Sequence, residues 1–280
     1  MQERNYEQSY KDKNHFSFGK NWGNFLSKVD NDKIDQAKVS LISFMGGEDK
    51  IRGKTFIDIG CGSGLFSLAA FLLGAKRIVS VDVDDFSVAC AAHLREKENN
   101  PENWEIKKGS ALDEEFIRNL GTFDVVYSWG VLHHTGDMYK AFRNIVHLLA
   151  ENSLFFLAIY NKNIGKNASL TGTSQLWLKI KKIYNTCNFF EKKIIEFLYY
   201  VWFIFGYLIT FRNPFCYIKN YGKERGMNFH NDVIDWLGGL PYEFATTDEL
   251  VNYFSEKGLL TKKVRSSNNL GCNEILLIKK

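Results

Sequence analysis

The feature that most constrains this chain is the stretch Thr55–Ser67, which reads TFIDIGCGSGLFS. An apolar run breaks into three alternate glycines, Gly60, Gly62 and Gly64, and continues into leucine-rich sequence that ends at Gly74. This order predicts a buried strand, a tight turn and a helix. Glycines let the backbone approach a ligand closely, and a helix N-terminus offers unpaired N–H groups. The turn is therefore a candidate ligand site.

Asp58, just before the turn, indicates which ligand the turn would hold. The chain contains no G-x-x-x-x-G-K-[ST] phosphate loop, and Leu65 stands where a G-x-G-x-x-G dinucleotide loop needs its third glycine. A carboxylate here would repel a pyrophosphate, but it suits the cationic ammonium and sulfonium of S-adenosylmethionine. The next apolar run, 78–81, ends in Asp82, whose carboxylate can accept both ribose hydroxyls. The alternative is an ordinary strand–turn–helix with chance glycines.

Two further segments extend the pattern. The glycine loop is followed by V-S-V-D at 79–82 and by F-D-V-V-Y-S-W-G-V-L-H-H at 123–134. Together these motifs resemble class I S-adenosylmethionine-dependent methyltransferases, over residues 50–160 and more loosely over 259–279. The resemblance implies a Rossmann-like fold with S-adenosyl-L-methionine as cofactor. The chain also looks like small-molecule methyltransferases of the quinone-biosynthesis and glycan-pathway type. The motifs are specific for the cofactor and give almost no information about the methyl acceptor.

The alternation of apolar runs and helical patterns predicts an α/β fold. We expect a mostly parallel seven-stranded sheet with helices on both faces, because strands that alternate with helices form parallel sheets covered on both sides. Asp137 is a predicted N-cap, and Thr246 with Glu249 forms a predicted capping box. The last two strands should form an antiparallel hairpin. The expected strands lie near 55–59, 77–82, 104–108, 123–128, 154–159, 259–265 and 274–279.

Cofactor-binding residues are expected at strand ends, because ligands of such sheets bind at the carboxyl ends of the strands. At the third strand, Ser110 stands where the resembling family commonly has an aspartate. The adenine contact is therefore expected from Ser110, from the Ala111 amide or from Asp113. The complete expected set is Asp58, Gly60, Cys61, Gly62, Gly64, Asp82, Val83, Ser110, Ala111, Trp129 and Gly130.

Four segments are expected along the chain. Residues 1–50 form an N-terminal lid or helical extension, and 51–160 form the cofactor-binding core. Residues 161–245 form a helical cap inserted after the fifth strand, and 246–280 supply the last helix and the closing strands. In the lid, Trp22 or Phe18 would cover the cofactor, and Trp22 would contact the substrate. The alternative is that the segment docks on the core through its aromatic side chains.

Composition limits the compartment and the partners. The 280 residues carry a net charge of +4, which is no strong nucleic-acid signal. Five cysteines without C-x-x-C spacing favour reduced thiols in a cytoplasmic protein. The N-terminus is too polar for a signal peptide.

The cap sequence combines lysines with a long apolar run. Leu176, Ile180, Ile183 and Cys187 follow helical spacing among lysines, which predicts an amphipathic basic helix. The apolar run 197–211 is shorter than the roughly 20 residues of a membrane span. The preferred interpretation is a helix packed on the core or on a second subunit of a homodimer. The alternative is peripheral contact with a membrane or with a lipid-linked substrate.

Histidines are the candidate bases for methyl transfer. His133 and His134 follow the fourth strand, in the loop that faces the cofactor's methyl group in the resembling family, and His230 is a second candidate. The alternative is that the His133–His134 pair only shapes the loop. No metal site is expected. Substrate contacts are expected from Trp22, Arg225, Asp232, Trp236 and Tyr242.

The preferred function is methyl transfer to a small-molecule hydroxyl oxygen. Histidines are suited to a hydroxyl acceptor, and the Asn/Asp-Pro-Pro-Tyr tetrapeptide typical of many nucleic-acid nitrogen methylases is absent. One alternative is an RNA methyltransferase, which the lysines and aromatic residues of 162–193 would favour. The other is a non-catalytic cofactor-binding partner subunit.

Overall fold

In this computed structural model, the described residues are 31–164, 172–225, 229–267 and 269–280. The expected lid, with Trp22, lies largely outside them. The described chain forms two compact units. One comprises residues 31–162 together with Glu243–Lys280, and the other is Asn163–Tyr242.

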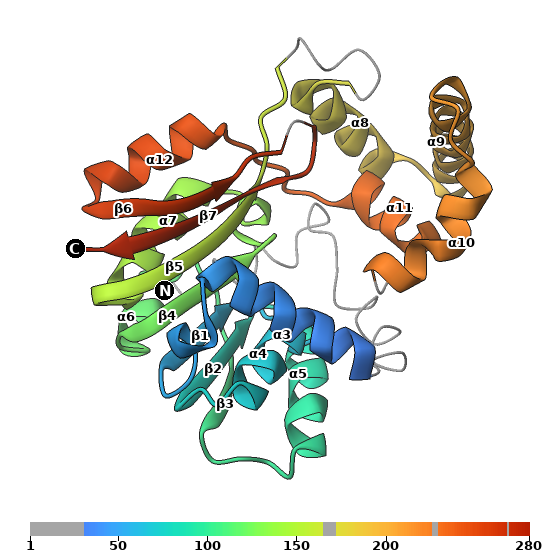
Figure 1. The fold of residues 1–280 in the computed structure, drawn as a ribbon. Helices are drawn as coiled ribbons and strands as arrows, with labels where there is room; N and C mark the ends of the chain where they lie inside the picture. Colours follow the sequence, from blue (N-terminus) through green and yellow to red (C-terminus); the bar gives the residue numbers. More distant parts are fainter. Residues whose placement is uncertain (1–30, 165–171, 226–228, 268) are drawn as a thin grey trace. The chain divides into compact units, whose positions relative to one another are not determined.

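The larger unit is built on one seven-stranded sheet (Figure 1). Its strand order is β3-β2-β1-β4-β5-β7-β6, and β7 runs antiparallel to both of its neighbours. The other pairings between neighbouring strands are parallel. The predicted mostly parallel sheet with a closing antiparallel hairpin is confirmed. The strands are β1 Thr55–Ile59, β2 Arg77–Asp82, β3 Trp104–Lys108, β4 Phe123–Trp129, β5 Leu149–Tyr160, β6 Leu259–Arg265 and β7 Cys272–Lys279.

Strand β5 begins five residues earlier than the apolar pattern predicts, at Leu149 instead of residue 154. Asn152 has a left-handed φ of 63°, and the β4–β5 register shifts between Phe123 and Val125. Ser153 holds this irregularity, because its hydroxyl accepts the Ala150 N–H at 2.9 Å and donates to the Phe123 carbonyl at 2.6 Å. A polar residue therefore extends the strand where hydrophobic periodicity gives no signal.

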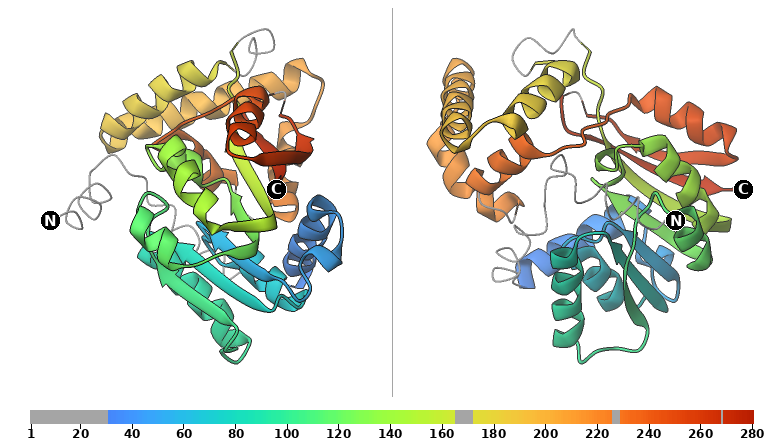
Figure 2. Two further views of the ribbon diagram at one scale, coloured as in Figure 1. Left: turned by 90° about the vertical axis from the view of Figure 1, so that its left-hand side faces the viewer. Right: turned by 180° about the vertical axis from the view of Figure 1, so that it is seen from behind.

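Helices cover both faces of the sheet (Figures 1 and 2). One face packs against α3 Asn31–Met45, α4 Leu65–Leu72 and α5 Asp85–Lys97. The other packs against α6 Glu114–Asn119, α7 Met138–Ile145 and α12 Thr247–Glu256. Both predicted caps are present, since Asp137 accepts the Lys140 N–H and Thr246 forms a capping box with Glu249. Short 3-10 turns complete the unit: η1 Glu48–Lys50, η2 Leu132–His134 and η3 Val146–Leu148.

The smaller unit is helical. It contains α8 Ser174–Thr186, α9 Phe189–Ile209, α10 Pro214–Arg225 and α11 Phe229–Gly238, which pack on one another (Figure 2). Aromatic rings fill its interior: Trp177 lies 5.2 Å from Trp236 and 6.0 Å from Tyr199, between ring centroids. Within the described residues, no helix combines the length and apolar character needed to cross a bilayer.

One of the lysines that suggested a basic helix surface lies inside this unit. Lys181 is buried, donates to the Trp236 carbonyl, and lies 4.2 Å and 4.8 Å from the ring centroids of Trp236 and Tyr242. Burial lowers the pKa of its ammonium to about 7. The exposed side of α8 instead includes Leu176 and Ile183. Spacing alone predicted the helix, but not which of its faces is buried.

The larger unit holds together the two points where the helical insertion begins and ends. Asn161 and Ala245 form a parallel β-bridge. The Lys162 N–H donates to the Ala245 carbonyl at 3.1 Å, and the Ala245 N–H donates to the Tyr160 carbonyl at 3.0 Å. The chain therefore leaves the sheet and returns to it at neighbouring positions.

Candidate active site

The glycine loop between β1 and α4 needs its glycines for two different reasons. Gly60, Gly62 and Gly64 all have left-handed φ values, of 75°, 52° and 79°, which side chains disfavour. In addition, a Cβ on Gly60 would lie 2.2 Å from Val131, and one on Gly64 would lie 2.9 Å from Ala91. Gly64 thus lets α4 approach α5, while Gly60 lets the loop after β4 pack directly on the glycine loop.

Asp82, at the end of β2, supports this loop. Its Oδ2 accepts the Gly62 N–H and its Oδ1 accepts the Asp84 N–H, both at 2.9 Å. Burial raises the pKa of the Asp82 carboxyl to about 6. A carboxylate has about four acceptor positions, so Asp82 keeps acceptor capacity for a ribose hydroxyl. The neighbouring Asp84 is an N-cap, since its carboxylate accepts two N–H groups of α5.

Asp58 is buried at the end of a chain of polar groups. The Trp104 indole donates to Ser80 at 2.8 Å, Ser80 donates to Ser67 at 2.7 Å, and Ser67 donates to Asp58 Oδ2 at 2.8 Å. Burial, together with the charge of Asp82, raises the pKa of the Asp58 carboxyl to about 7. A cationic ligand would favour the ionised carboxylates. The two residues therefore fit a ligand that carries positive charge and a ribose.

The three expected adenine contacts at the third strand end differ in what each can still offer a ligand, since the Ser110 hydroxyl and the Ala111 amide can donate while the Asp113 carboxylate can only accept. Asp113 caps α6, because its carboxylate accepts the Phe116 N–H at 3.0 Å. The Ser110 hydroxyl accepts the Leu112 N–H at 3.1 Å. The carbonyl of the buried Ala111 accepts a hydrogen bond from the Asn144 side-chain amide at 2.9 Å. Of the three expected adenine contacts, Ser110 and the Ala111 amide are thus better placed than the Asp113 carboxylate.

The remaining expected cofactor residues lie around the same strand ends. Cys61 is buried and donates its N–H to the Val81 carbonyl at 3.0 Å, and Val83 is half-buried directly after Asp82. Trp129 ends β4, where its indole N–H donates to Glu274 Oε1 at 3.0 Å. Gly130 follows with a φ of 76°.

The two histidines after β4 have different surroundings. His133 is fully buried, and its Nδ1 accepts the Tyr160 N–H at 3.3 Å. Its ring centroid lies 4.0 Å from that of Tyr160 and 4.4 Å from that of His134. His134 is half-buried, and its N–H donates to the Val131 carbonyl at 2.8 Å. Val131 packs on Gly60, and His133 and His134 follow Val131 directly in the same loop, at the second and third positions after it.

Tyr160 and Glu243 support this loop, and neither was predicted as a site residue. The Glu243 N–H donates to the His133 carbonyl at 2.9 Å, while its carboxylate accepts the N–H groups of Gly136 and Met138 at 3.1 Å. Tyr160 ends β5, so the strand-end argument that selected Asp58 would also have found it. Glu243 lies 107 residues after Gly136 and gives no sequence signal.

Apart from Trp22, which lies outside the described residues, the other expected catalytic and substrate residues belong to the helical unit. The His230 imidazole lies 2.5 Å from the Tyr200 hydroxyl, between Nδ1 and Oη, and Asp232 accepts from the Tyr221 hydroxyl. Trp236 and Tyr242 both face Lys181, while Arg225 ends α10. Their roles in catalysis and substrate binding stay predictions. Among the described residues, no group of three or more His, Cys, Asp or Glu side chains could hold a metal ion.

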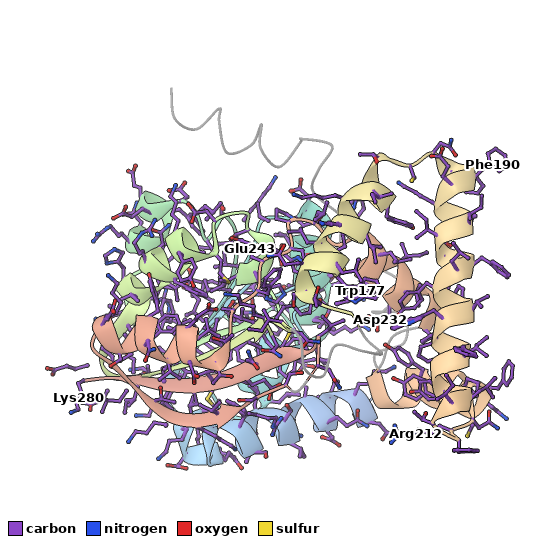
Figure 3. All side chains as sticks on the ribbon, turned by 90° about the horizontal axis from the view of Figure 1, so that it is seen from above. Trp177, Phe190, Arg212, Asp232, Glu243 and Lys280 are labelled. Atoms are coloured by element: carbon purple, nitrogen blue, oxygen red, sulfur yellow. The ribbon has the colours of Figure 1, made fainter. Side chains whose placement is uncertain are left out.

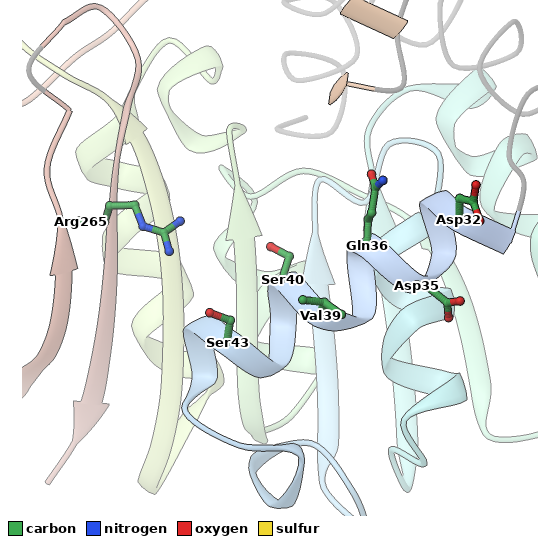
Figure 4. Close-up of a pocket in the computed structure, with 7 residues that line it drawn as sticks. All are labelled: Asp32, Asp35, Gln36, Val39, Ser40, Ser43 and Arg265. Carbon is green, nitrogen blue, oxygen red and sulfur yellow. The ribbon is translucent and has the colours of Figure 1, made fainter. Parts of the chain in front are cut away.

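A pocket of about 530 Å³ lies along α3 in the larger unit, opposite Arg265 (Figure 4). Arg265 pairs with Glu274 at 2.8 Å, and Glu274 also accepts the Trp129 indole N–H. None of the lining residues is an expected cofactor residue. They are Asp32, Asp35, Gln36, Val39, Ser40, Ser43 and Arg265.

Comparison with known proteins agrees with this geometry. A family model described as "Methyltransferase domain" matches residues 50–207. The ribosomal protein L11 methyltransferase of Streptococcus uberis is 33% identical over 113 residues, which are 40% of this chain and 35% of that protein. PKMT2 from Rickettsia typhi, solved in complex with AdoHcy, has a TM-score of 0.58 at 14% identity, covering 87% of this chain and 52% of its own. Magnesium protoporphyrin IX methyltransferase from Synechocystis, solved with bound SAH, has a TM-score of 0.52 at 13% identity, covering 88% and 83%.

With this sheet order and glycine loop, the chain has the architecture of a class I S-adenosylmethionine-dependent methyltransferase, as the motifs predicted. It belongs to the methyltransferase-domain family, because the family model matches more than half of its residues. S-adenosylmethionine is accordingly the cofactor of this domain. The two solved structures share its fold, and the match to the Streptococcus uberis protein spans only 35% of that relative's length.

Proposed function

We propose that the protein transfers a methyl group from S-adenosylmethionine to a hydroxyl oxygen of a small molecule, with His134 as general base. The observation that carries this proposal is the packing of Val131 on Gly60, which joins the histidine loop to the glycine loop. A half-buried imidazole near the methyl donor is suited to take a hydroxyl proton at neutral pH.

The cofactor would supply an electrophilic methyl group and a good leaving group, so the protein mainly orients the acceptor and removes its proton. His134 takes that proton. His133 acts as a positioning residue: its Nδ1 accepts the Tyr160 N–H, so the neutral ring keeps its own proton on Nε2. Glu243 fixes the backbone of the same loop through the His133 carbonyl and the Gly136 N–H.

Asp58 and Asp82 would hold the cofactor. Asp82 accepts the ribose hydroxyls while it keeps the Gly62 N–H in place. Asp58 adds negative charge beside the loop, and Ser67 fixes its orientation. Ser110 and the Ala111 amide remain the proposed adenine contacts.

The class of molecule that accepts the methyl group is a separate part of the proposal. The L11 relative acts on a ribosomal protein and the Synechocystis relative on a magnesium porphyrin, as their names state, so the family resemblance leaves the acceptor open. The paired histidines support a hydroxyl acceptor.

The test is transfer of label from methyl-labelled S-adenosylmethionine to an extract of the source cells, separated into small molecules, lipid, glycan, protein and RNA. We expect label in a small-molecule fraction, and we expect Asp58→Ala to abolish it. Asp49→Ala, which changes an exposed carboxylate on η1, is the matched control and should keep full activity. Label that appears only in protein or RNA would overturn the acceptor class, and no label in any fraction would overturn the enzymatic proposal.

A further inference from the structure

Helix α9 turns an apolar face to solvent. The stripe consists of Phe190, Ile194, Phe197, Val201, Phe205 and Leu208. Intervals of three and four residues place these side chains on one face of an α-helix. Phe190 is 77% exposed and Phe205 62%. A surface helix of a globular protein normally directs such a stripe toward the core.

The opposite face of α9 is more polar. Glu196 is the one buried residue of this helix, and it accepts from the Tyr184 hydroxyl at 2.9 Å and from Lys193 at 2.7 Å. Tyr199 and Tyr200 are half-buried. The helix is thus held in its unit by Glu196, by tyrosines and by the half-buried Phe203, whose ring centroid lies 4.8 Å from that of Phe229, while the six side chains of the stripe remain outside.

The turn from α9 to α10 adds a second, independent observation. Phe211 has a left-handed φ of 54° and is 100% exposed, and Phe215 is 68% exposed. Position 211 follows the helix end, where the Arg212 N–H donates to the Tyr207 carbonyl at 2.9 Å and where glycine is usual. A phenylalanine here bears backbone strain and gains no burial. Such strain is commonly retained where the side chain has a function.

The charge around this surface is positive. Apart from the buried Lys181, helices α8 to α10, residues 174–225, contain eight lysines and arginines against three glutamates. Lys179, Lys182 and Arg212 are exposed. Figure 3 shows Phe190 and Arg212 near opposite ends of α9, so a basic side chain lies at the C-terminal end of this helix. Apolar and aromatic residues bordered by lysine and arginine are the pattern of helices that lie in the interface of an anionic membrane.

We propose that α9 and its turn into α10, residues 189–215, bind the surface of an anionic lipid bilayer. The helix lies in the interfacial plane, with its aromatic and aliphatic side chains among the upper acyl chains and its lysines and arginines at the headgroups. This docking goes beyond methyl transfer and does not depend on it.

Two observations favour lipid over a second copy of the chain. The exposed apolar arc extends past the stripe to Leu198, Trp202 and Ile209, which makes it wider than the seam of a coiled coil. A second copy would also bring the same excess of positive charge into contact with itself, whereas anionic headgroups neutralise that charge.

The test is co-sedimentation of the full protein with vesicles of phosphatidylcholine alone or mixed with phosphatidylglycerol. We expect binding to the anionic vesicles and much weaker binding to the neutral ones. Phe197→Gln/Phe205→Gln should lower the partition coefficient by about tenfold or more, because two phenyl groups no longer leave water. The matched control is Leu72→Gln, which changes an exposed apolar side chain on α4 and should bind like the unchanged protein. Because all three side chains are exposed, thermal unfolding should change little.

Three outcomes would overturn the proposal. One is the absence of binding to anionic vesicles, and another is equal binding by the unchanged protein and the double variant. The third is a concentration-dependent dimer in sedimentation velocity that the double variant dissociates, which would assign the face to a second copy. None of these outcomes depends on methyl transfer.

Discussion

The Ser67 hydroxyl donates to Asp58 Oδ2 at 2.8 Å, so the first helix after the glycine loop holds the carboxylate that precedes it. Both side chains are buried. Removing the donor leaves a buried acceptor unsatisfied, which costs about 1–3 kcal/mol. We expect Ser67→Ala to lower the free energy of unfolding by about that amount in urea titrations. Ser87→Ala, at an equally buried serine on α5, is the control and should cost less. Equal losses would mean that the Asp58 contact adds nothing.

Cofactor binding should depend on pH. Burial raises the pKa of Asp58 to about 7 and that of Asp82 to about 6, above the 3.8 of an unfolded aspartate. For these groups the stability contribution is greatest below pH 3.8 and falls as the pH rises through about 7. A cationic ligand favours the ionised carboxylates, so binding should tighten from about pH 5 to about pH 7 and release protons.

Calorimetric titration at pH 6 in two buffers with different heats of ionisation measures this proton release. Asp58→Asn should reduce the release and flatten the pH dependence of the dissociation constant. Asp137→Asn, at the N-cap of α7, serves as the control and should leave both unchanged. Proton uptake on binding would contradict the raised pKa values.

Gly60→Ala should be more damaging than its backbone conformation alone explains. A residue with a side chain is strained by about 1–3 kcal/mol at the φ of 75° that Gly60 adopts. The added Cβ would also overlap Val131, at 2.2 Å. Gly121→Ala isolates the first effect, because Gly121 has a φ of 79° and nothing within 4 Å of such a Cβ. We expect Gly60→Ala to lose cofactor affinity in addition to stability, and Gly121→Ala to lose stability only. Similar cofactor affinity in the two variants would count against close packing of the two loops.

Substitutions of His134 and of His133 should have different effects on the pH–rate profile. If His134 is the base, His134→Asn should lower kcat by about 10²–10⁴-fold and remove the rise of kcat with pH. His133→Asn keeps an acceptor near the position of Nδ1, so it should retain the shape of the profile. A His134→Asn enzyme with an unchanged profile would remove His134 from the proton transfer.

Lys181→Met should stabilise the helical unit at neutral pH. Burial lowers the pKa of Lys181 to about 7, well below the 10.5 of an unfolded lysine. Its burial therefore destabilises the fold most below pH 7, and this cost disappears as the pH rises toward 10.5. Thermal unfolding of both proteins at pH 6.5 and pH 9.5 should show a stabilising effect of the substitution that shrinks at the higher pH. A larger effect at pH 9.5 would show that cation–π contacts with Trp236 and Tyr242 dominate instead.

Local rules predicted most of the larger unit. The strand, glycine turn and helix at 55–72 followed from hydrophobic period and glycine spacing, and the caps at Asp137 and Thr246 followed from side-chain chemistry. These features depend on residues that are near one another in sequence. The early start of β5 did not follow, because it depends on Ser153 bonding to Phe123, thirty residues away.

The unpredicted features depend on distant partners. In the sequence, Lys181 is indistinguishable from a surface lysine. Its burial depends on contacts with Trp236 and Tyr242, which lie more than fifty residues further along the chain. Glu243 gains its role only when the fold brings it to the loop after β4. The sequence left the apolar run of α9 open between packing on the core, a second subunit and a membrane, because a hydrophobic stripe does not show whether it points inward or outward.

The bridge between Asn161 and Ala245 makes the helical insertion modular. Because the chain departs and rejoins at hydrogen-bonded positions, insertions, deletions or exchanges within 163–242 leave the hydrogen bonds at both of these positions in place. The helices can thus change while the cofactor-binding unit keeps its sheet.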